Sequence, residues 1–479
     1  MTNISASDDS QSHRRRRRGL PIADAWLPDL DAGEETEGDR PTSGLLGGRK
    51  SWQEMTPRER NLWLVKAVLL GALTLTVVFH PSSAVRDVLV WGAFFYLLFR
   101  ERKTLLARKP DLLSLALLAY VVVVLASVVY SAHRHWSVKD ASKFMVVLAM
   151  VFAGWHLFKN RAFLFGFLQL LIGSVLVVCI CDVITYLSGL GRLWQWGERW
   201  VDGPYYGHPN TASAILVLLF PLSAFLFAHS RNFWLRAMQV CFLVLGLLLI
   251  YILASRTAQL ALVFVVLSAA LLTRPRKRKL IAIFAVGCVL VAVFLNLRAL
   301  NPRFMDETFR SLTFRDENWR NLRTLIAKRP VFGYGYGKSN YQTVYHRSFP
   351  GSVIPYQHAH SLILQTAFET GIVGLAAMMW LWGTVAYRLL RGYALNRNPY
   401  GTLCAALFVS LIGISVYCLA EVPDGFLRSL SWLLVAMTGA LTGLTADEGR
   451  SSWLQAGSLR YKERFFHRGE RRGRRGSKE

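Results

Sequence analysis

Charged residues are scarce in this 479-residue chain, at 18% of the total, and acidic side chains are fewer than basic ones, 30 against 56. Apolar residues make up 53% of the chain and occur in runs close to the ~20 residues that cross a ~30 Å hydrocarbon core. No stretch has the composition of a separate soluble domain. The sequence therefore predicts an all-α polytopic membrane protein.

Cysteine is also scarce, and it is confined to the apolar runs. The six cysteines are Cys179, Cys181, Cys241, Cys288, Cys404 and Cys418. None lies in the polar stretch 299–360, so neither a disulfide framework nor a cysteine-based zinc site is expected there. We also find no carboxylate pair and no cluster of His and Asp spaced to bind a metal ion.

The apolar runs predict about twelve transmembrane helices. They lie near 62–79, 84–99, 111–130, 142–158, 162–187, 211–229, 236–254, 257–273, 280–298, 361–390, 400–419 and 426–444. The chain is thereby divided into a disordered leader at 1–60, nine spans within 61–298, a polar loop at 299–360, three spans within 361–445 and a basic tail at 446–479.

Basic clusters give the expected orientation, because short loops rich in Lys and Arg stay in the cytoplasm. The clusters at 14–18, 100–109, 159–161, 231–236, 274–279, 388–397 and 460–478 fall on one side if the N-terminus is cytoplasmic. Both termini are then cytoplasmic, and the loop at 299–360 lies on the opposite, periplasmic side. The apolar runs begin more than forty residues from the N-terminus, so a cleaved signal peptide is not expected.

The net charge of +26 raises the possibility of nucleic-acid binding. Most of the surplus, however, lies in the tails and in loops beside the spans, where it sets topology and contacts anionic lipid. We therefore expect no nucleic-acid partner.

The loop at 299–360 carries nine Lys and Arg against four acids. An excess of cations on the non-cytoplasmic side opposes the usual charge bias. One explanation is an anionic, phosphate-bearing ligand at the bilayer surface. The alternative is that long loops escape the charge rule.

Within this loop, Trp319, Leu322, Leu325 and Ile326 recur at helical spacing, which predicts an amphipathic helix lying in the membrane interface. The alternative is a basic surface helix held by lipid headgroups. The glycine-rich turn 330–337 follows, and its backbone N–H groups are candidates for contacting a phosphate. The turn lacks the Gly-Lys-Ser/Thr of a P-loop, so this signal is weak.

Two histidines, His358 and His360, end the loop just before an apolar run. We expect a short helix from Ser361 to Glu369, with Gly371 turning the chain into the bilayer. The positive end of that helix disfavours an imidazolium at His360 and favours a neutral ring that accepts a proton, as a general base must. The alternative is a histidine that only caps the helix or binds a loop carbonyl.

The sequence from His358 to Gln365, followed by 369–374, resembles the signature of the O-antigen ligase/polymerase superfamily. Four further segments match in the expected order, namely 207–210, 255–260, 315–319 and 329–335. Ser361 departs from the pattern, since many members carry Asn there.

This resemblance implies a glycosyltransferase of GT-C-like architecture in the bacterial inner membrane. It would move a glycan from an undecaprenyl-diphosphate carrier to a hydroxyl of lipid A core oligosaccharide, with inversion and without a metal ion or other cofactor. In this interpretation His360 is the catalytic base, and Arg256 and Arg315 bind the donor diphosphate. The secondary candidates, for which structural roles are favoured, are His358, Lys338, Arg347, Asn210 and Glu369.

The roles of Arg256 and Arg315 each have an alternative interpretation. Arg256 begins a predicted span and could extend toward the interface as a snorkelling side chain. Arg315 could pair with Asp316 or Glu317 as a surface charge.

Two other functions remain open. The first is an O-antigen polymerase of the same superfamily, which extends a glycan on one carrier with glycan from another. The second is a transporter or flippase of a lipid-linked anion, which would need ionisable residues at mid-depth of several spans. Lys66 and Asp182 are nearly the only candidates, which disfavours transport.

Overall fold

The computed structural model describes residues 56–78, 83–107, 110–187, 209–253, 255–272, 303–350, 358–396, 399–423 and 427–441, and all regular structure in them is helical. The helices are α2 (Pro57–Val78), α3 (Ser83–Ala107), α4 (Leu112–Val129), α5 (Arg134–Leu157), α6 (Arg161–Leu187), α7 (Pro209–His229), α8 (Phe233–Ile252), α9 (Arg256–Leu272), α11 (Arg303–Lys328), α12 (Lys338–Ser348), α13 (Leu362–Leu395) and α14 (Pro399–Ala420). A further apolar helix covers Leu427–Leu441.

Seven helices of the described residues are long and apolar enough to cross a membrane, namely α4, α5, α6, α7, α8, α13 and α14. Two shorter apolar helices are α9 and Leu427–Leu441. The chain is thus consistent with a polytopic membrane protein. The expected span at 280–298, the leader before residue 56 and the basic tail lie outside the described residues, so the count of twelve, the orientation and the five-part division remain predictions.

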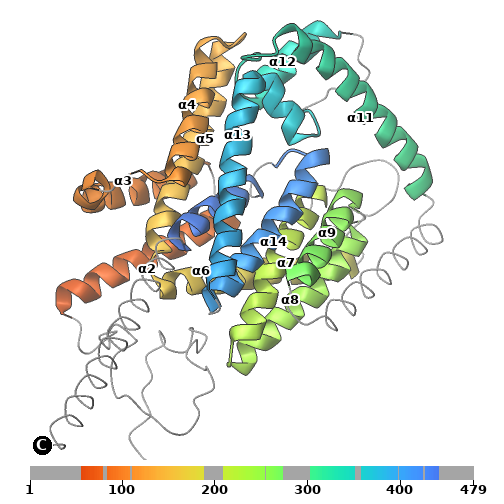
Figure 1. The fold of residues 1–479 in the computed structure, drawn as a ribbon. Coiled ribbons are helices and arrows are strands. Elements are labelled where there is room, and N and C mark those ends of the chain that lie inside the picture. Colours follow the sequence, from red (N-terminus) through yellow and green to blue (C-terminus); the bar gives the residue numbers. More distant parts are fainter. Residues whose placement is uncertain are drawn as a thin grey trace, which may run out of the picture.

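The helix α14 lies at the centre of the packing, in contact with α7, α9 and α13. Two close contacts position α14 against its neighbours. The hydroxyl of Ser410 donates to the carbonyl of Leu218 on α7, and Gly413 leaves room for the side chain of Val265 on α9. Helix α13 also packs along α4. Figure 1 shows α13 running through the middle of the molecule, with α7, α9 and α14 on one side and α4 and α5 on the other.

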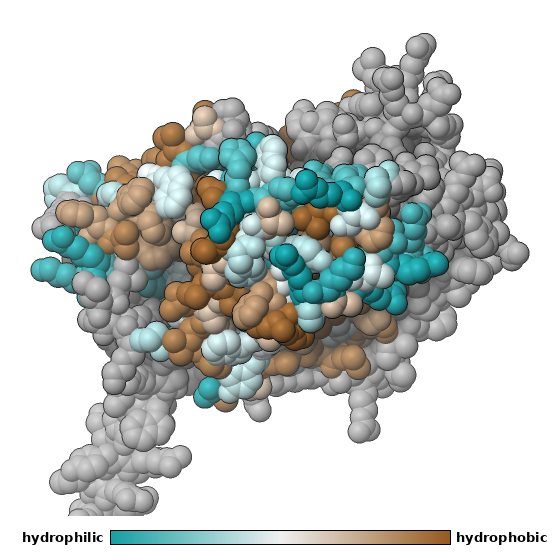
Figure 2. Space-filling view, turned by 90° about the horizontal axis from the view of Figure 1, so that it is seen from above, coloured by the Kyte–Doolittle hydropathy of each residue, from teal (hydrophilic) through white to brown (hydrophobic). Residues whose placement is uncertain are grey.

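Helices α11 and α12 lie over the end of the bundle where α13 begins (Figure 1). We call this end, formed by α11, α12 and residues 358–370, the site end. Seen from there, hydrophilic residues gather in the middle of the described surface with hydrophobic residues beside them (Figure 2).

The amphipathic helix predicted around Trp319 is present as part of α11, but its apolar face is turned toward protein. Leu322 and Leu325 are fully buried in a core with Tyr341 and Tyr345 of α12 and Phe368 of α13. The apolar stripe is therefore covered by protein, and the position of α11 relative to the membrane interface stays a prediction. Packing against α12 and α13 removes the two leucines from both water and lipid.

The glycine-rich turn 330–337 was a weak candidate for contacting a phosphate, but in the structure its backbone N–H groups make internal hydrogen bonds. The N–H groups of Tyr334 and Gly335 donate to the carbonyls of Phe368 and Glu369, at 2.9 and 2.8 Å. The N–H of Tyr336 donates to the hydroxyl of Ser127. These donors are already satisfied within the protein and are not free to bind an anion.

The predicted break in the helix after Glu369 is confirmed. Gly371 has φ 65° and ψ −163° inside α13, in the region where only glycine is unstrained. The break frees backbone groups of α13, and the N–H of Ile372 donates to the carbonyl of Pro330 at 2.8 Å. The turn 330–337 therefore fixes where α13 bends.

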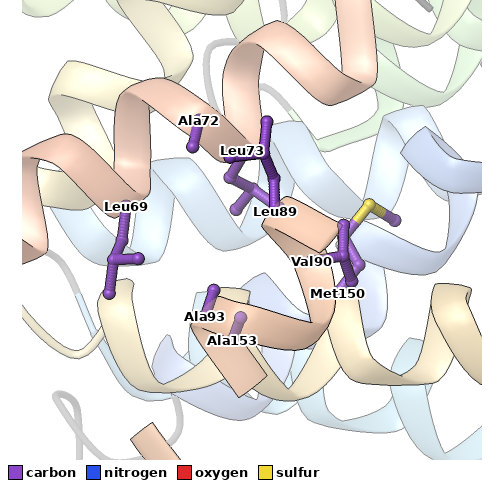
Figure 3. A pocket seen from close by; sticks show the side chains of 8 residues that line it. All are labelled: Leu69, Ala72, Leu73, Leu89, Val90, Ala93, Met150 and Ala153. Atoms are coloured by element: carbon purple, nitrogen blue, oxygen red, sulfur yellow. The ribbon is translucent and has the colours of Figure 1, made fainter. Parts of the chain in front are cut away.

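Figure 3 shows a pocket that lies apart from these features. It is lined by Leu69, Ala72, Leu73, Leu89, Val90, Ala93, Met150 and Ala153, from α2, α3 and α5. All of these side chains are apolar, and none belongs to the predicted site. The pocket is a packing gap between helices and offers no polar group for a reaction.

Substituting Gly371 by alanine should destabilise the fold. An added Cβ at φ 65° would be strained and would collide with the backbone of Val331. We expect a loss of at least about 1 kcal/mol in the free energy of unfolding, measured as a lower midpoint of thermal unfolding in detergent. Gly383→Ala is the matched control, because a Cβ at Gly383 of the same helix meets nothing within 4 Å. Equal midpoints for the two variants would contradict this account of the bend.

Candidate active site

Four predicted site residues converge on one acidic side chain, Glu421, which directly follows α14. Its side chain is only 5% exposed. Arg315 of α11 donates to Oε1 of Glu421 at 2.5 Å, and Asn210 in the first turn of α7 donates to the same oxygen at 2.8 Å. A buried carboxylate needs such partners, because removing it from water without them is very unfavourable.

The second oxygen of Glu421 faces the two histidines. Nδ1 of His360 lies 3.1 Å from Oε2, and Nε2 of His358 lies 3.6 Å from the same atom. The two imidazole rings are 4.2 Å apart, and both side chains are about a quarter exposed. If His360 donates its Nδ1 hydrogen to the carboxylate, its Nε2 is the nitrogen that can accept a proton.

The pKa values of Glu421 and His358 are both shifted by their surroundings. Burial alone raises the pKa of Glu421, but hydrogen bonds from His358 and His360 and the charge of Arg315 outweigh it and hold that pKa below its usual value. Burial lowers the pKa of the His358 ring, against the opposing effect of Glu421. At neutral pH the cluster therefore contains a carboxylate anion beside a neutral His358 imidazole.

The backbone of the segment 358–360 is clamped by three side chains. Asn318 Nδ2 donates to the carbonyl of His358 at 3.2 Å, and the indole N–H of Trp319 donates to the carbonyl of Ala359 at 2.8 Å. On the other side, the N–H of Ala359 donates to Oε1 of Gln365 at 2.9 Å.

This clamp coincides with an unusual conformation. His360 has φ 50°, and it is the one positive φ outside glycine in the described part of the chain. Such a conformation is unfavourable for a residue with a side chain and persists where surrounding contacts enforce it. The contacts of the preceding peptide thus hold the ring of His360 toward Glu421.

Of the remaining predicted residues, Glu369 supports the clamp indirectly. Its Oε1 accepts a hydrogen bond from Nε2 of Gln365 at 2.7 Å, and the side chain is buried in α13. Lys338, at the start of α12, is near enough for its charge to help lower the pKa of His358. Arg347, in the last turn of α12, is exposed.

Arg256 lies at the same end of the bundle as the cluster. The opposite end of α9 is fixed by the hydroxyl of Tyr393, near the end of α13, which donates to the carbonyl of Leu272. Because α13 begins at the site end, the first residue of α9 must lie toward the site end as well. The side chain of Arg256 is half-buried there.

This geometry excludes one alternative and corrects one expectation. Arg315 pairs with Glu421, while Asp316 pairs with Arg320, so Arg315 is not a surface partner of its neighbours in sequence. The expectation that no cluster is spaced for a metal is wrong. The side-chain ligand atoms of His358, His360 and Glu421 all lie within 4.8 Å of one another.

Glu421 was not predicted from the sequence, and neither were the roles of Asn318, Trp319 and Gln365 at the clamp. The sequence does contain a signal that could have identified Glu421. The residue directly follows a 22-residue apolar helix, and acidic residues in such segments are rare and tend to be functional. No sequence signal identifies its partners, because Arg315 is 106 residues away and His360 is 61 residues away along the chain.

Comparison with known proteins gives two findings. Residues 241–379 match a family model described as O-antigen ligase, a range that includes Arg256, Arg315, His358 and His360 but ends before Glu421. The chain is also similar to an O-antigen ligase of Salmonella typhimurium (strain LT2), with 29% identity over 278 residues. That alignment covers 53% of this chain and 62% of the relative, so less than two thirds of the relative is matched.

Trp319→Phe should loosen the clamp while leaving most of the packing intact. The buried carbonyl of Ala359 would lose its donor, at a cost of about 1–3 kcal/mol. We expect faster amide hydrogen exchange in the peptide that contains Ala359, measured by mass spectrometry. Trp380→Phe, at an exposed tryptophan of α13, serves as the control and should leave this peptide unchanged. Unaltered exchange in Trp319→Phe would show that the indole does not hold the segment.

Proposed function

Because this chain is an O-antigen ligase-like protein, we propose that it is a glycosyltransferase that attaches a lipid-linked glycan to lipopolysaccharide core. The donor is an undecaprenyl-diphosphate-linked glycan, and the acceptor is a hydroxyl of lipid A core oligosaccharide. The observation that carries the proposal is the convergence of one guanidinium and two imidazoles on the buried carboxylate of Glu421.

In the proposed reaction His360 is the general base. Its Nε2 takes the proton of the acceptor hydroxyl while that oxygen forms a bond to the anomeric carbon of the donor sugar. The bond from the anomeric carbon to the carrier's diphosphate breaks on the opposite face, so the configuration is inverted. Glu421 positions the ring and stabilises the imidazolium that forms, through its contact with Nδ1.

The leaving diphosphate is bound by arginines. Arg315 is oriented by its ion pair with Glu421, and its side chain is 21% exposed. Arg256, at the start of α9, is the second guanidinium at this end. Two guanidinium groups match the charge and the paired oxygens of a diphosphate.

Such fixed cations can stabilise the departing charge in place of a divalent ion, so we propose that transfer needs no metal. Lys338, near His358, adds to the positive potential.

The acceptor distinguishes a ligase from a polymerase. The matching family model is described as O-antigen ligase, and the Salmonella relative is named an O-antigen ligase. Both support lipid A core, rather than a second carrier-linked glycan, as the acceptor. We propose that the reaction takes place at the periplasmic side of the bacterial inner membrane, which the charge distribution along the sequence supports.

The proposal is tested by reconstituting purified protein with undecaprenyl-diphosphate glycan and lipid A core, with EDTA present. We expect glycan to appear on the lipid A core in the absence of metal. His360→Ala should lower the turnover rate by about 10²–10⁴-fold, because the general base is lost. Arg256→Ala and Arg315→Ala should raise the KM for the donor and also lower the turnover rate, because both guanidinium groups stabilise the departing diphosphate.

His346→Ala, in α12, is the matched histidine control and should transfer glycan at the unaltered rate. Full activity of His360→Ala would exclude that residue as the base. Product only on a second carrier-linked glycan would identify a polymerase instead. Movement of donor across vesicles without a new glycosidic bond would identify a transporter.

A further inference from the structure

The cluster of His358, His360 and Glu421 has the composition of a zinc site. Zn²⁺ binds imidazole nitrogen and carboxylate oxygen at about 2.0–2.2 Å, usually with four ligands in a tetrahedron. Two ligands of such a tetrahedron are separated by roughly 3.3 Å. The separations of Oε2 of Glu421 from the two ring nitrogens are 3.1 and 3.6 Å, which bracket that value.

The surroundings also suit an ion at this point. Arg315 and Asn210 both donate to Oε1 of Glu421, so they orient the carboxylate and leave Oε2 directed at the histidines. Both histidine side chains are partly exposed, so an ion can reach the cluster from solvent, and water is available as a fourth ligand. The charges of Arg315 and Lys338 oppose a cation, so the site should bind more weakly than a structural zinc site.

The geometry points to a reversible zinc-binding site at His358, His360 and Glu421 that inhibits the protein. The inhibition rests on the proposed role of His360. A neutral imidazole carries one hydrogen, and Zn²⁺ at Nδ1 forces that hydrogen onto Nε2. Nε2 is then a donor and cannot accept the proton of an acceptor hydroxyl. Zinc thus fixes the inactive tautomer of the base while the protein stays folded.

Zinc binding is tested first without any substrate. Isothermal titration of the purified full-length protein in nanodiscs with Zn²⁺ should show one ion per chain. His358→Ala should weaken binding by at least about tenfold, because it removes one of three ligands. His346→Ala, at a histidine of α12 outside the cluster, should bind as the unaltered protein does. Equal binding by His358→Ala and the unaltered protein would overturn the site.

A second measurement needs no variant. Diethyl pyrocarbonate modifies accessible histidines, and bound Zn²⁺ should protect His358 and His360 but leave His346 as reactive as before. Mass spectrometry of the peptides gives the modified fraction at each residue. Protection that is absent, or equal at all three histidines, would contradict a local site.

The inhibition is then measured by transfer activity. Zn²⁺ should reduce transfer over the concentration range in which it binds, and excess EDTA should restore it. Binding to an active protein without loss of transfer would overturn the inhibitory role. A protein that binds zinc at the cluster but transfers no glycan, with or without EDTA, would refute the proposed function while leaving the site intact.

Discussion

The site depends on one buried carboxylate. Glu421 is almost inaccessible to water, yet it stays charged because Arg315, Asn210 and His360 all bind it. These partners come from α11, from α7 and from the turn before α13, so the carboxylate joins three separate parts of the chain. Removing a single partner of a buried ion pair costs about 3–5 kcal/mol, which makes the arrangement strongly interdependent.

A second constraint acts on the backbone around the histidines. Asn318 and Trp319 bind carbonyls of the segment 358–360 from one side, and Gln365 binds the N–H of Ala359 from the other. The fold thereby stabilises the positive φ of His360 and directs its ring at Glu421. The bend at Gly371 and the turn 330–337 also support this clamp, because together they fix the position of the short helix that supplies Gln365.

Local features of this structure could be predicted from the sequence, whereas contacts between distant residues could not. The start of the helix after Ser361 and its break at Gly371 follow from local signals, and both were predicted correctly. The apolar stripe of α11 was also recognised, but a stripe does not say whether lipid or protein covers it, and here α12 and α13 do. Glu421 was missed because its importance comes from partners 61 or more residues away, which a single sequence does not pair.

The most direct test of the account is the steady-state kinetics of Glu421→Gln. The amide keeps the shape of the side chain but removes the negative charge that orients the base and stabilises its protonated form. The account predicts a turnover rate that is lower by about 10²-fold or more, in a protein that is still folded in the membrane. An unchanged turnover rate would contradict the claim that the Glu421 carboxylate organises the reaction.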